Sequence, residues 1–248
     1  MTVKPIRVWL TPPGPNPWKV IFVLEELNIP YEIKSFAFAE VKKKPFIDIN
    51  PNGRVPAIED PNTNLTLWES GAIITYLVEQ YDTAHKLGHT TLNEKHLVNQ
   101  WLHFQTSGQG PYYGQMGWFN VLHEEKIPSA ITRYKNEVLR VLTVLDGVLQ
   151  GRDWLVGDKM TIADMSFVPW NDRLDDLLVQ PLDETYDGLP HVRAWHERMA
   201  GRPAWMRTCA IRKGLMMEQG LLDATGMPEG YGSIQEYLAD LKEGKVRG

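Results

Sequence analysis

Cysteine is almost absent from this chain, since Cys209 is the single one among 248 residues. One thiol excludes an internal disulfide, and it also excludes a Cys-x-x-Cys redox pair. Any thiol chemistry that this protein performs must therefore use the sulfur of a ligand.

Long apolar runs are missing as well. No stretch approaches the roughly 20 uninterrupted apolar residues of a membrane span, and the first ten residues, MTVKPIRVWL, lack the apolar region of a signal peptide. We therefore expect a cytoplasmic protein without a membrane partner.

Positive charge is not in excess, because Lys and Arg number 26 against 31 Asp and Glu, which gives a net charge of -5. The sequence also has no cluster of Lys and Arg with interleaved aromatic residues. A nucleic-acid partner is therefore not expected.

Familiar catalytic and metal motifs are lacking. The chain has no Gly-x-Ser-x-Gly turn, phosphate-binding loop, dinucleotide glycine fingerprint or His-Glu-x-x-His helix. His85 and His89 have the spacing of a helical metal pair, but Gly88 lies between them and no carboxylate or Cys completes a ligand set. We expect no hydrolase, kinase or dehydrogenase chemistry and no metal.

The composition is typical of a globular chain, with 43% apolar and 23% charged residues. Apolar spacing in the first third predicts a strand at 6–10, a helix at 18–27, a strand at 31–38, a helical turn at 45–49, a hairpin, and a helix from Ser70. This order is a split βαβ unit followed by a ββα unit, which indicates a thioredoxin-like domain.

Beyond residue 82 the pattern changes, because polar turn formers interrupt the apolar periodicity and only helical spacing follows. We predict an α/β thioredoxin-like domain at 1–83, a linker at 84–93, and an all-α helical-bundle domain at 94–248 that carries an extended tail. The expected helices are 94–124, bent at 107–111, then 129–150, 191–199, and a patch IQEYLADLKE near the end. The tail at 216–248 either covers a substrate pocket or is loosely attached.

Thr161-Ile162-Ala163-Asp164 precedes an apolar run and has the spacing of a capping box. In that motif the Thr161 side chain accepts from the third helical amide, and Asp164 reaches back to the cap amide. Asp164 is therefore interpreted as structural and is excluded from the candidate catalytic acids.

The stretch from Asn50 to Ser70, NPNGRVPAIEDPNTNLTLWES, contains two pairs with chemical potential. The first is Val55-Pro56, because a cis prolyl bond would turn the Val55 backbone N–H and C=O outward, where an extended peptide ligand can pair with them. The alternative is an ordinary trans proline that opens an edge strand.

The second pair is Glu69-Ser70, at the predicted start of a helix. Free amides at a helix N-terminus attract a carboxylate, the Ser70 hydroxyl adds a donor, and the Glu69 side chain is an anion for a nearby ammonium group. Together they fit the head of an α-amino acid. A plain helix cap with a favourable first-turn acid is the alternative.

These motifs resemble the glutathione site of cytosolic glutathione transferases. The segments FQTSGQGP, RYKNEV and WLVGDKMTIADMSFVPWN extend the resemblance to residues 5 to 207, and they are most similar to the fungal class typified by the yeast nitrogen-regulator prion protein and its bacterial disulfide-reductase relatives. The resemblance implies glutathione as co-substrate and a homodimer. It also implies that Val55 pairs with the cysteinyl backbone, that Glu69 and Ser70 hold the γ-glutamyl head, and that Arg54 lies near other groups of the tripeptide.

A glutathione thiolate needs a hydrogen-bond donor, and a helix N-terminus after the first strand is the usual place for one. This loop offers Thr11, Asn16 and backbone amides. Asn16 matches the asparagine of the resembled class and is our candidate catalytic residue, while an ordinary N-cap is its alternative role. Gly14 stands where some bacterial relatives have Thr, which argues against strong thiolate activation.

Tyr112, Tyr113, Trp118 and Phe119 follow the predicted bend in the second domain. We expect either one wall of an apolar substrate pocket or plain core and dimer packing. Arg133 matches an arginine that reaches toward the tripeptide in the resembled class, and a solvated helix charge is the alternative. Thr11 is also a candidate for the substrate pocket.

The sequence therefore indicates a glutathione-dependent enzyme that conjugates glutathione to a small apolar electrophile, in secondary metabolism or detoxification. Isomerisation of a small metabolite through transient thiol addition and disulfide exchange are the enzymatic alternatives. A non-enzymatic regulatory protein is the alternative of another class. The first strand is expected to begin near residue 6, without the Asn/Gln-rich extension of the yeast regulator, which argues against a prion-like regulator.

Overall fold

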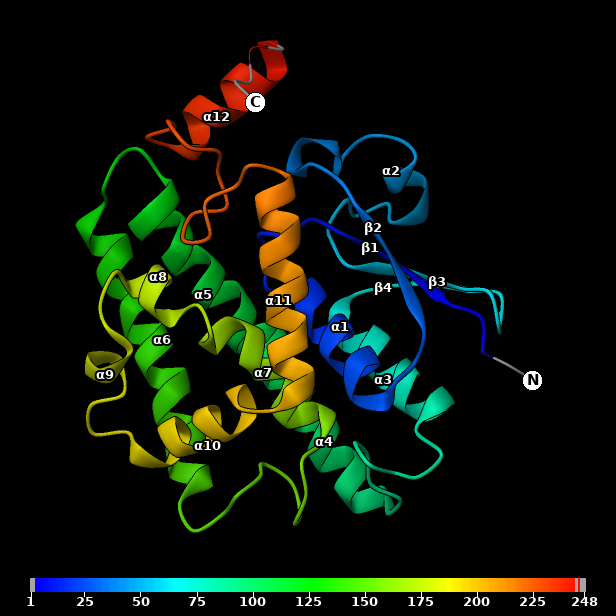
Figure 1. Ribbon diagram of the computed structural model, residues 1–248. Helices are drawn as coiled ribbons and strands as arrows, with labels where there is room; N and C mark the ends of the chain where they lie inside the picture. Colours follow the sequence, from blue (N-terminus) through cyan, green and yellow to red (C-terminus); the bar gives the residue numbers. More distant parts are fainter. Residues whose placement is uncertain (1–2, 244, 246–248) are drawn as a thin grey trace. The chain divides into compact units, whose positions relative to one another are not determined.

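The structure is a computed structural model, and it describes residues 3–243 and 245. The chain forms two compact units (Figure 1). As far as its residues are described, the first unit comprises Met1–Ala84, Pro203–Glu229 and Leu238–Gly248, and the second comprises His85–Arg202 and Gly230–Tyr237.

A four-stranded sheet forms the centre of the first unit, with β1 (Ile6–Leu10), β2 (Tyr31–Ser35), β3 (Ala57–Asp60) and β4 (Leu65–Trp68) in the order β2-β1-β3-β4. β1 is parallel to β2 and antiparallel to β3, which pairs antiparallel with β4. Ile6, Val8 and Leu10 alternate along β1 and are fully buried. The predicted thioredoxin-like arrangement of the sheet is confirmed.

Two helices of this unit position the candidate site. α1 (Asn16–Leu27) begins after Pro15, two residues earlier than predicted, and α3 (Ser70–Tyr81) begins at the predicted residue. α2 (Phe46–Ile49) is short, and a 3-10 turn, η1 (Phe38–Glu40), takes up the residues that follow β2. β2 ends at Ser35, three residues short of the prediction, since its partner β1 ends at Leu10.

The second unit is helical, as predicted. It contains α4 (Leu92–Phe104), α5 (Gly110–Gly117), α6 (Pro128–Leu149), α7 (Ile162–Asn171), α8 (Leu174–Leu178), α9 (Leu182–Thr185) and α10 (Pro190–Ala200). The expected bend at 107–111 is a π-helical segment, η2 (Gln105–Gln109), and a second one, η3 (Trp118–Leu122), follows α5. Pro111 lies in the first turn of α5, directly after η2, which is a helix position that tolerates proline.

A helix that the sequence pattern did not predict, α11 (Pro203–Glu218), belongs to the first unit and lies beside α1 (Figure 1). The rings of Phe22 and Trp205 lie 5.1 Å apart, and Arg207 pairs with Glu25 at 2.6 Å. The prediction divided the chain once, with a linker at 84–93 and everything after it in the helical domain. By its contacts, however, the segment Pro203–Glu229 belongs to the first unit.

The segment after α11 is attached to the first unit up to residue 229. Gln219 Nε2 donates to Ser35 Oγ at 2.8 Å. Gly226 has φ +71°, and a Cβ at this position would lie 2.5 Å from Pro13 Cβ. This part of the tail is therefore not loosely attached, and it lies against the loop that precedes Asn16. The last helix, α12 (Ile234–Glu243), has the bounds of the predicted helical patch.

Asp164 has the structural role that the capping box predicts. It is fully buried, and its carboxylate accepts hydrogen bonds from the amides of Thr161 and Leu155 and from Trp195 Nε1, at 2.9 to 3.0 Å. Burial raises the pKa of this carboxyl group, against the effect of these donors.

We expect Asp164→Asn to lower the free energy of unfolding by about 1 to 2 kcal/mol, because an amide provides one acceptor oxygen where the carboxylate provides two. Chemical denaturation measures the change. Asp158→Asn is the matched control, since Asp158 is exposed in the same unit. Equal stability of the two variants would contradict the structural role.

Candidate functional site

The N-terminus of α3 combines an unusual backbone with unpaired amides. Glu69 is the N-cap residue and has φ +72° and ψ +114°, a conformation that side-chain-bearing residues rarely adopt. The first helical hydrogen bond runs from the Ile73 amide to the Glu69 carbonyl, so the amides of Ser70, Gly71 and Ala72 have no helical partner. Glu69 is exposed, whereas Ser70 is buried. This end of α3 presents amide donors and a hydroxyl beside a carboxylate.

Val55 lies just before β3. The Val55–Pro56 bond is cis, and within the described residues neither the amide nor the carbonyl of Val55 has a backbone partner. Its half-buried side chain packs on the cluster that contains Phe46 and Ala57, which holds the residue in place. An extended peptide can pair with such an open backbone as an added strand.

Arg54 is exposed next to Val55. Its carbonyl accepts from Asn50 Nδ2 at 2.5 Å. Gly53 has φ +59°, and a Cβ there would meet the Val41 carbonyl at 2.7 Å, so only glycine fits this turn. The turn leaves the Arg54 side chain facing solvent.

The two candidate thiol donors occupy different positions. Asn16 is the first residue of α1 and is half-buried, and the N-cap is Pro15, which has no capping side chain. Asn16 is therefore not the N-cap residue of α1, which was the alternative role considered for it. Thr11 follows β1 and is 2% exposed, so its hydroxyl is less accessible than the Asn16 amide. The Pro12 carbonyl accepts from Trp18 Nε1 at 3.0 Å, which fixes the loop between them.

Lys19 is a residue of this site that the sequence did not single out. It lies one turn after Asn16 on α1, is 1% exposed, and its Nζ donates to Ser70 Oγ at 3.3 Å. Burial lowers the pKa of this ammonium group to about 7, and the charge of Glu69 acts in the opposite direction. This contact joins the start of α1 to the start of α3, and so brings the Asn16 turn to the Glu69-Ser70 pair. The available signal was a lysine inside the apolar run WKVIFVL.

The aromatic candidates lie in the second unit, and most of them group together. Phe119 and Tyr134 stack with ring centroids 5.6 Å apart, and Tyr112 lies 6.4 Å from Tyr134. Trp118 is half-buried and contacts His123. Tyr113 differs, because it is fully buried against Trp170. The pocket role stays a prediction for all of them, and for Tyr113 the packing is that of a core residue.

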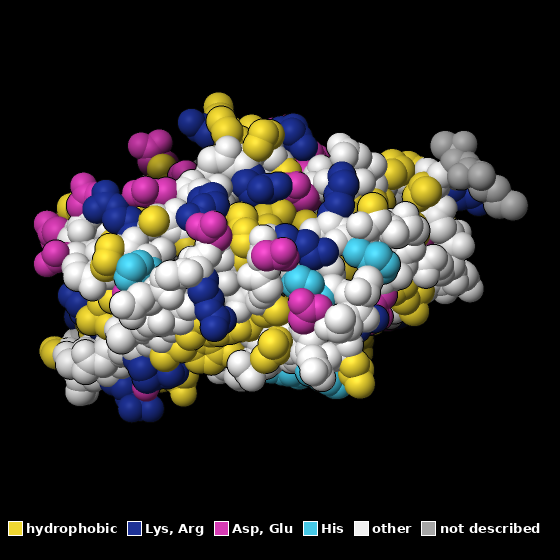
Figure 2. All heavy atoms as spheres, turned by 90° about the horizontal axis from the view of Figure 1, so that it is seen from below, with side chains coloured by type: hydrophobic (Ala, Val, Ile, Leu, Met, Phe, Trp, Pro, Cys, Tyr) yellow, Lys and Arg dark blue, Asp and Glu magenta, His cyan; other side chains and the backbone are white. Residues whose placement is uncertain are grey.

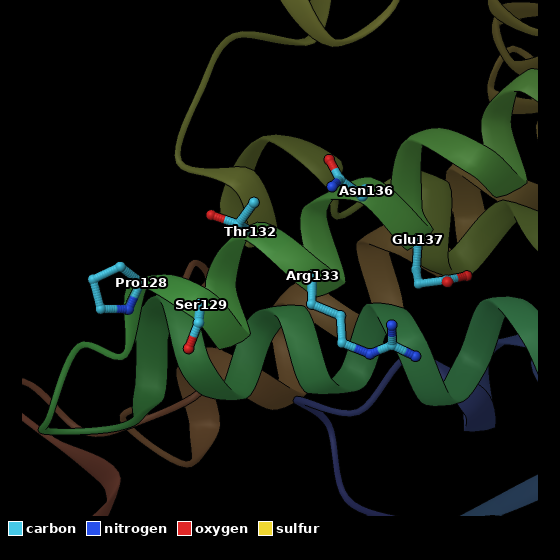
Figure 3. Close-up of a pocket in the computed structure, with 6 residues that line it drawn as sticks. All are labelled: Pro128, Ser129, Thr132, Arg133, Asn136 and Glu137. Atoms are coloured by element: carbon cyan, nitrogen blue, oxygen red, sulfur yellow. The ribbon is translucent and has the colours of Figure 1, made fainter.

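Arg133 is exposed on α6, where it lines a shallow groove of about 550 Å³. Figure 3 shows that the side chains around this groove come from successive turns of that helix: Pro128, Ser129, Thr132, Arg133, Asn136 and Glu137. Most of the residues that line the groove have polar or charged side chains. A role of Arg133 toward the tripeptide stays a prediction.

The face in Figure 2 mixes Lys and Arg with Asp and Glu and shows no continuous basic field. Over the described residues, no helix is long and apolar enough to cross a membrane. In the same part of the chain, no three His, Cys, Asp or Glu side chains are grouped so that they could hold a metal ion.

Comparison with known proteins identifies the class to which this fold and site belong. Residues 4–79 match the family model of the glutathione S-transferase N-terminal domain, and residues 111–203 match that of the C-terminal domain. The glutathione S-transferase-like protein gedE of Aspergillus terreus is 47% identical over 207 residues, which are 80% of this chain and 91% of gedE.

Solved structures agree. The glutathione transferase URE2P8 of Phanerochaete chrysosporium, crystallised with oxidized glutathione, has a TM-score of 0.81 and 44% identity over 86% of this chain and 97% of its own. Ure2p5 of the same fungus, cocrystallised with 1-(S-glutathionyl)-2,4-dinitrobenzene, has a TM-score of 0.78 and 40% identity over 87% of this chain and 97% of its own. The chain belongs to the glutathione S-transferase family, and its neighbours are Ure2p-type transferases.

Proposed function

We propose that this protein is a glutathione transferase that conjugates glutathione to a small apolar electrophile. The observation that carries the proposal is the start of α3, where the strained Glu69 and the buried Ser70 adjoin three amides that have no helical partner among the described residues. The γ-glutamyl carboxylate fits the amides and the hydroxyl, and its ammonium group fits Glu69. The cysteinyl backbone then pairs with Val55, and Arg54 lies near the other groups of the tripeptide.

Asn16 is the proposed donor to the sulfur. A hydrogen bond to the thiolate stabilises the charged form, so the thiol loses its proton more readily and the sulfur becomes a better nucleophile. The thiolate attacks the electrophilic carbon, a carbon–sulfur bond forms, and the electron pair passes to a leaving group or to an adjacent atom that then takes a proton. Tyr112, Trp118 and Phe119 are the proposed apolar contacts for the electrophile, with Arg133 toward the tripeptide, and we propose a homodimer.

Disulfide exchange is the second candidate, and the relative that binds oxidized glutathione favours it. In this reaction a glutathione thiolate attacks a mixed disulfide, one sulfur–sulfur bond forms, and another breaks with release of a thiolate. The same Asn16 donor serves this step. Cys209 lies on α11, away from the residues of the proposed site in the sequence, and has no part in this scheme.

A turnover assay separates the possibilities. Purified protein is supplied with glutathione and a panel of small electrophiles, and separately with a glutathione mixed disulfide. Conjugate formation supports the transferase, and reduction of the mixed disulfide alone supports the second candidate. Tight glutathione binding without turnover of any substrate would contradict both and favour a regulatory binding protein.

A further inference from the structure

Lys19 is a buried residue of the candidate site that has no role in the proposed reaction. Its amine lies behind Ser70, at 3.3 Å from the hydroxyl oxygen, and the whole side chain is buried. A lysine ammonium has three donors and no acceptor, so when Lys19 is protonated Ser70 Oγ must accept at this contact. A serine hydroxyl that accepts on one side keeps its own proton for a different partner.

We propose that Lys19 is a positioning residue for the γ-glutamyl carboxylate, which turns the Ser70 hydroxyl proton outward and places a positive charge behind the bound anion. This role rests on the proposed glutathione site. The carboxylate would bond to Ser70 at about 2.7 Å, so it would lie within roughly 6 Å of the Lys19 amine. At that range an anion in a buried site strongly favours the charged amine.

Glu69, at the start of α3, is a charged group whose field reaches Lys19 and raises its pKa. Charged side chains of α11 and of the sheet, the elements next to α1 and to α3, are paired with one another. On α11, Arg207 is paired with Glu25, and Arg212 with Asp223. In the sheet, Arg7 is paired with Glu32 and Glu59, and Asp60 accepts from Tyr76 and Tyr81.

A measurable consequence follows from the titration of this amine. Burial holds the pKa of Lys19 at about 7 in the free protein, so at pH 8 the amine is mostly neutral. A bound carboxylate raises that pKa by about one to two units. Binding at pH 8 therefore takes up about half a proton, whereas at pH 6 the amine is already charged and takes up almost none.

The test uses S-methylglutathione, because its blocked sulfur removes the thiol proton from the balance. Calorimetry in two buffers of different ionisation enthalpy gives the protons taken up, at pH 6 and at pH 8. Lys19→Met keeps an unbranched apolar stem and should lose the uptake that belongs to lysine, with about tenfold weaker binding at pH 6. Lys34→Met, at an exposed lysine of the same unit, is the control and should match the wild type.

Equal uptake at pH 8 in the wild type and Lys19→Met would overturn the proposal, since the ligand's own amine would then account for all of it. Lys19→Gln serves if the methionine variant does not fold. If neither folds, the wild type decides alone, and the same uptake at pH 6 and pH 8 overturns the role. S-methylglutathione that does not bind at all would instead overturn the proposed glutathione site.

Discussion

Glu69→Ala is expected to weaken glutathione binding by about 1.5 to 3 kcal/mol, which is roughly a 10- to 150-fold rise in Kd. Glu69 is proposed to pair with the one ammonium group of the tripeptide, and a charged hydrogen bond in a partly enclosed site has this magnitude. Alanine keeps the Cβ, so the backbone strain at φ +72° is not relieved by the substitution. The loss would therefore report the carboxylate itself, and calorimetry measures it.

Two further variants make this result specific. Glu79→Ala removes an exposed acid farther along α3 and is expected to leave the affinity unchanged. Glu69→Gln keeps the shape without the charge, and most of the loss should remain. If folded Glu69→Ala protein bound glutathione as tightly as the wild type, Glu69 would not belong to the site.

Asn16→Ala is expected to lower turnover by about tenfold or more while glutathione affinity changes only a few fold. Turnover and affinity should respond differently because of the proposed geometry. The tripeptide is held by Val55, Glu69 and Ser70, whereas Asn16 contacts only the sulfur. Loss of a donor to the thiolate raises the pKa of the bound thiol, so less thiolate is present at neutral pH.

Ultraviolet absorbance of the thiolate against pH checks the cause directly. The pKa of bound glutathione should lie below that of free glutathione in the wild type and should rise in Asn16→Ala. Thr11→Ala is the control, since Thr11 is the other side-chain donor of the loop and is 2% exposed. A pKa that changes with Thr11 and not with Asn16 would transfer the role. One that changes with neither would assign it to backbone amides.

The sequence predicted those elements whose apolar residues share one face. β1 and α12 have the predicted bounds, and α3 begins at the predicted Ser70. The helix α11 was missed because its apolar residues point in all directions. Trp205 and Met216 are buried, whereas Met206 and Met217 are more than 60% exposed. A helix of this kind is defined by the partner that it packs on, here α1, and the local pattern does not contain that partner.

The residues of the candidate site also differ in whether the local sequence predicted them. Glu69 and Ser70 were predictable because a helix start is a local event with known chemistry. Lys19 was not predictable, because a lysine on a helix usually indicates a solvated charge. Its partner Ser70 is 51 residues away in the chain. The helical spacing after residue 94 also suggested a single helical domain to the C-terminus. Arg207 instead donates to Glu25, and Gln219 donates to Ser35, so this part of the segment packs on the first unit.

A crystal structure of the protein with glutathione would show whether the first unit binds the tripeptide at the start of α3. We predict the γ-glutamyl carboxylate on Ser70 and the free amides of α3, its ammonium group on Glu69, and the cysteinyl backbone paired with Val55. The sulfur should lie within hydrogen-bond reach of Asn16. Glutathione bound elsewhere, without contact to Glu69 and Ser70, would show that the start of α3 is not the glutathione site.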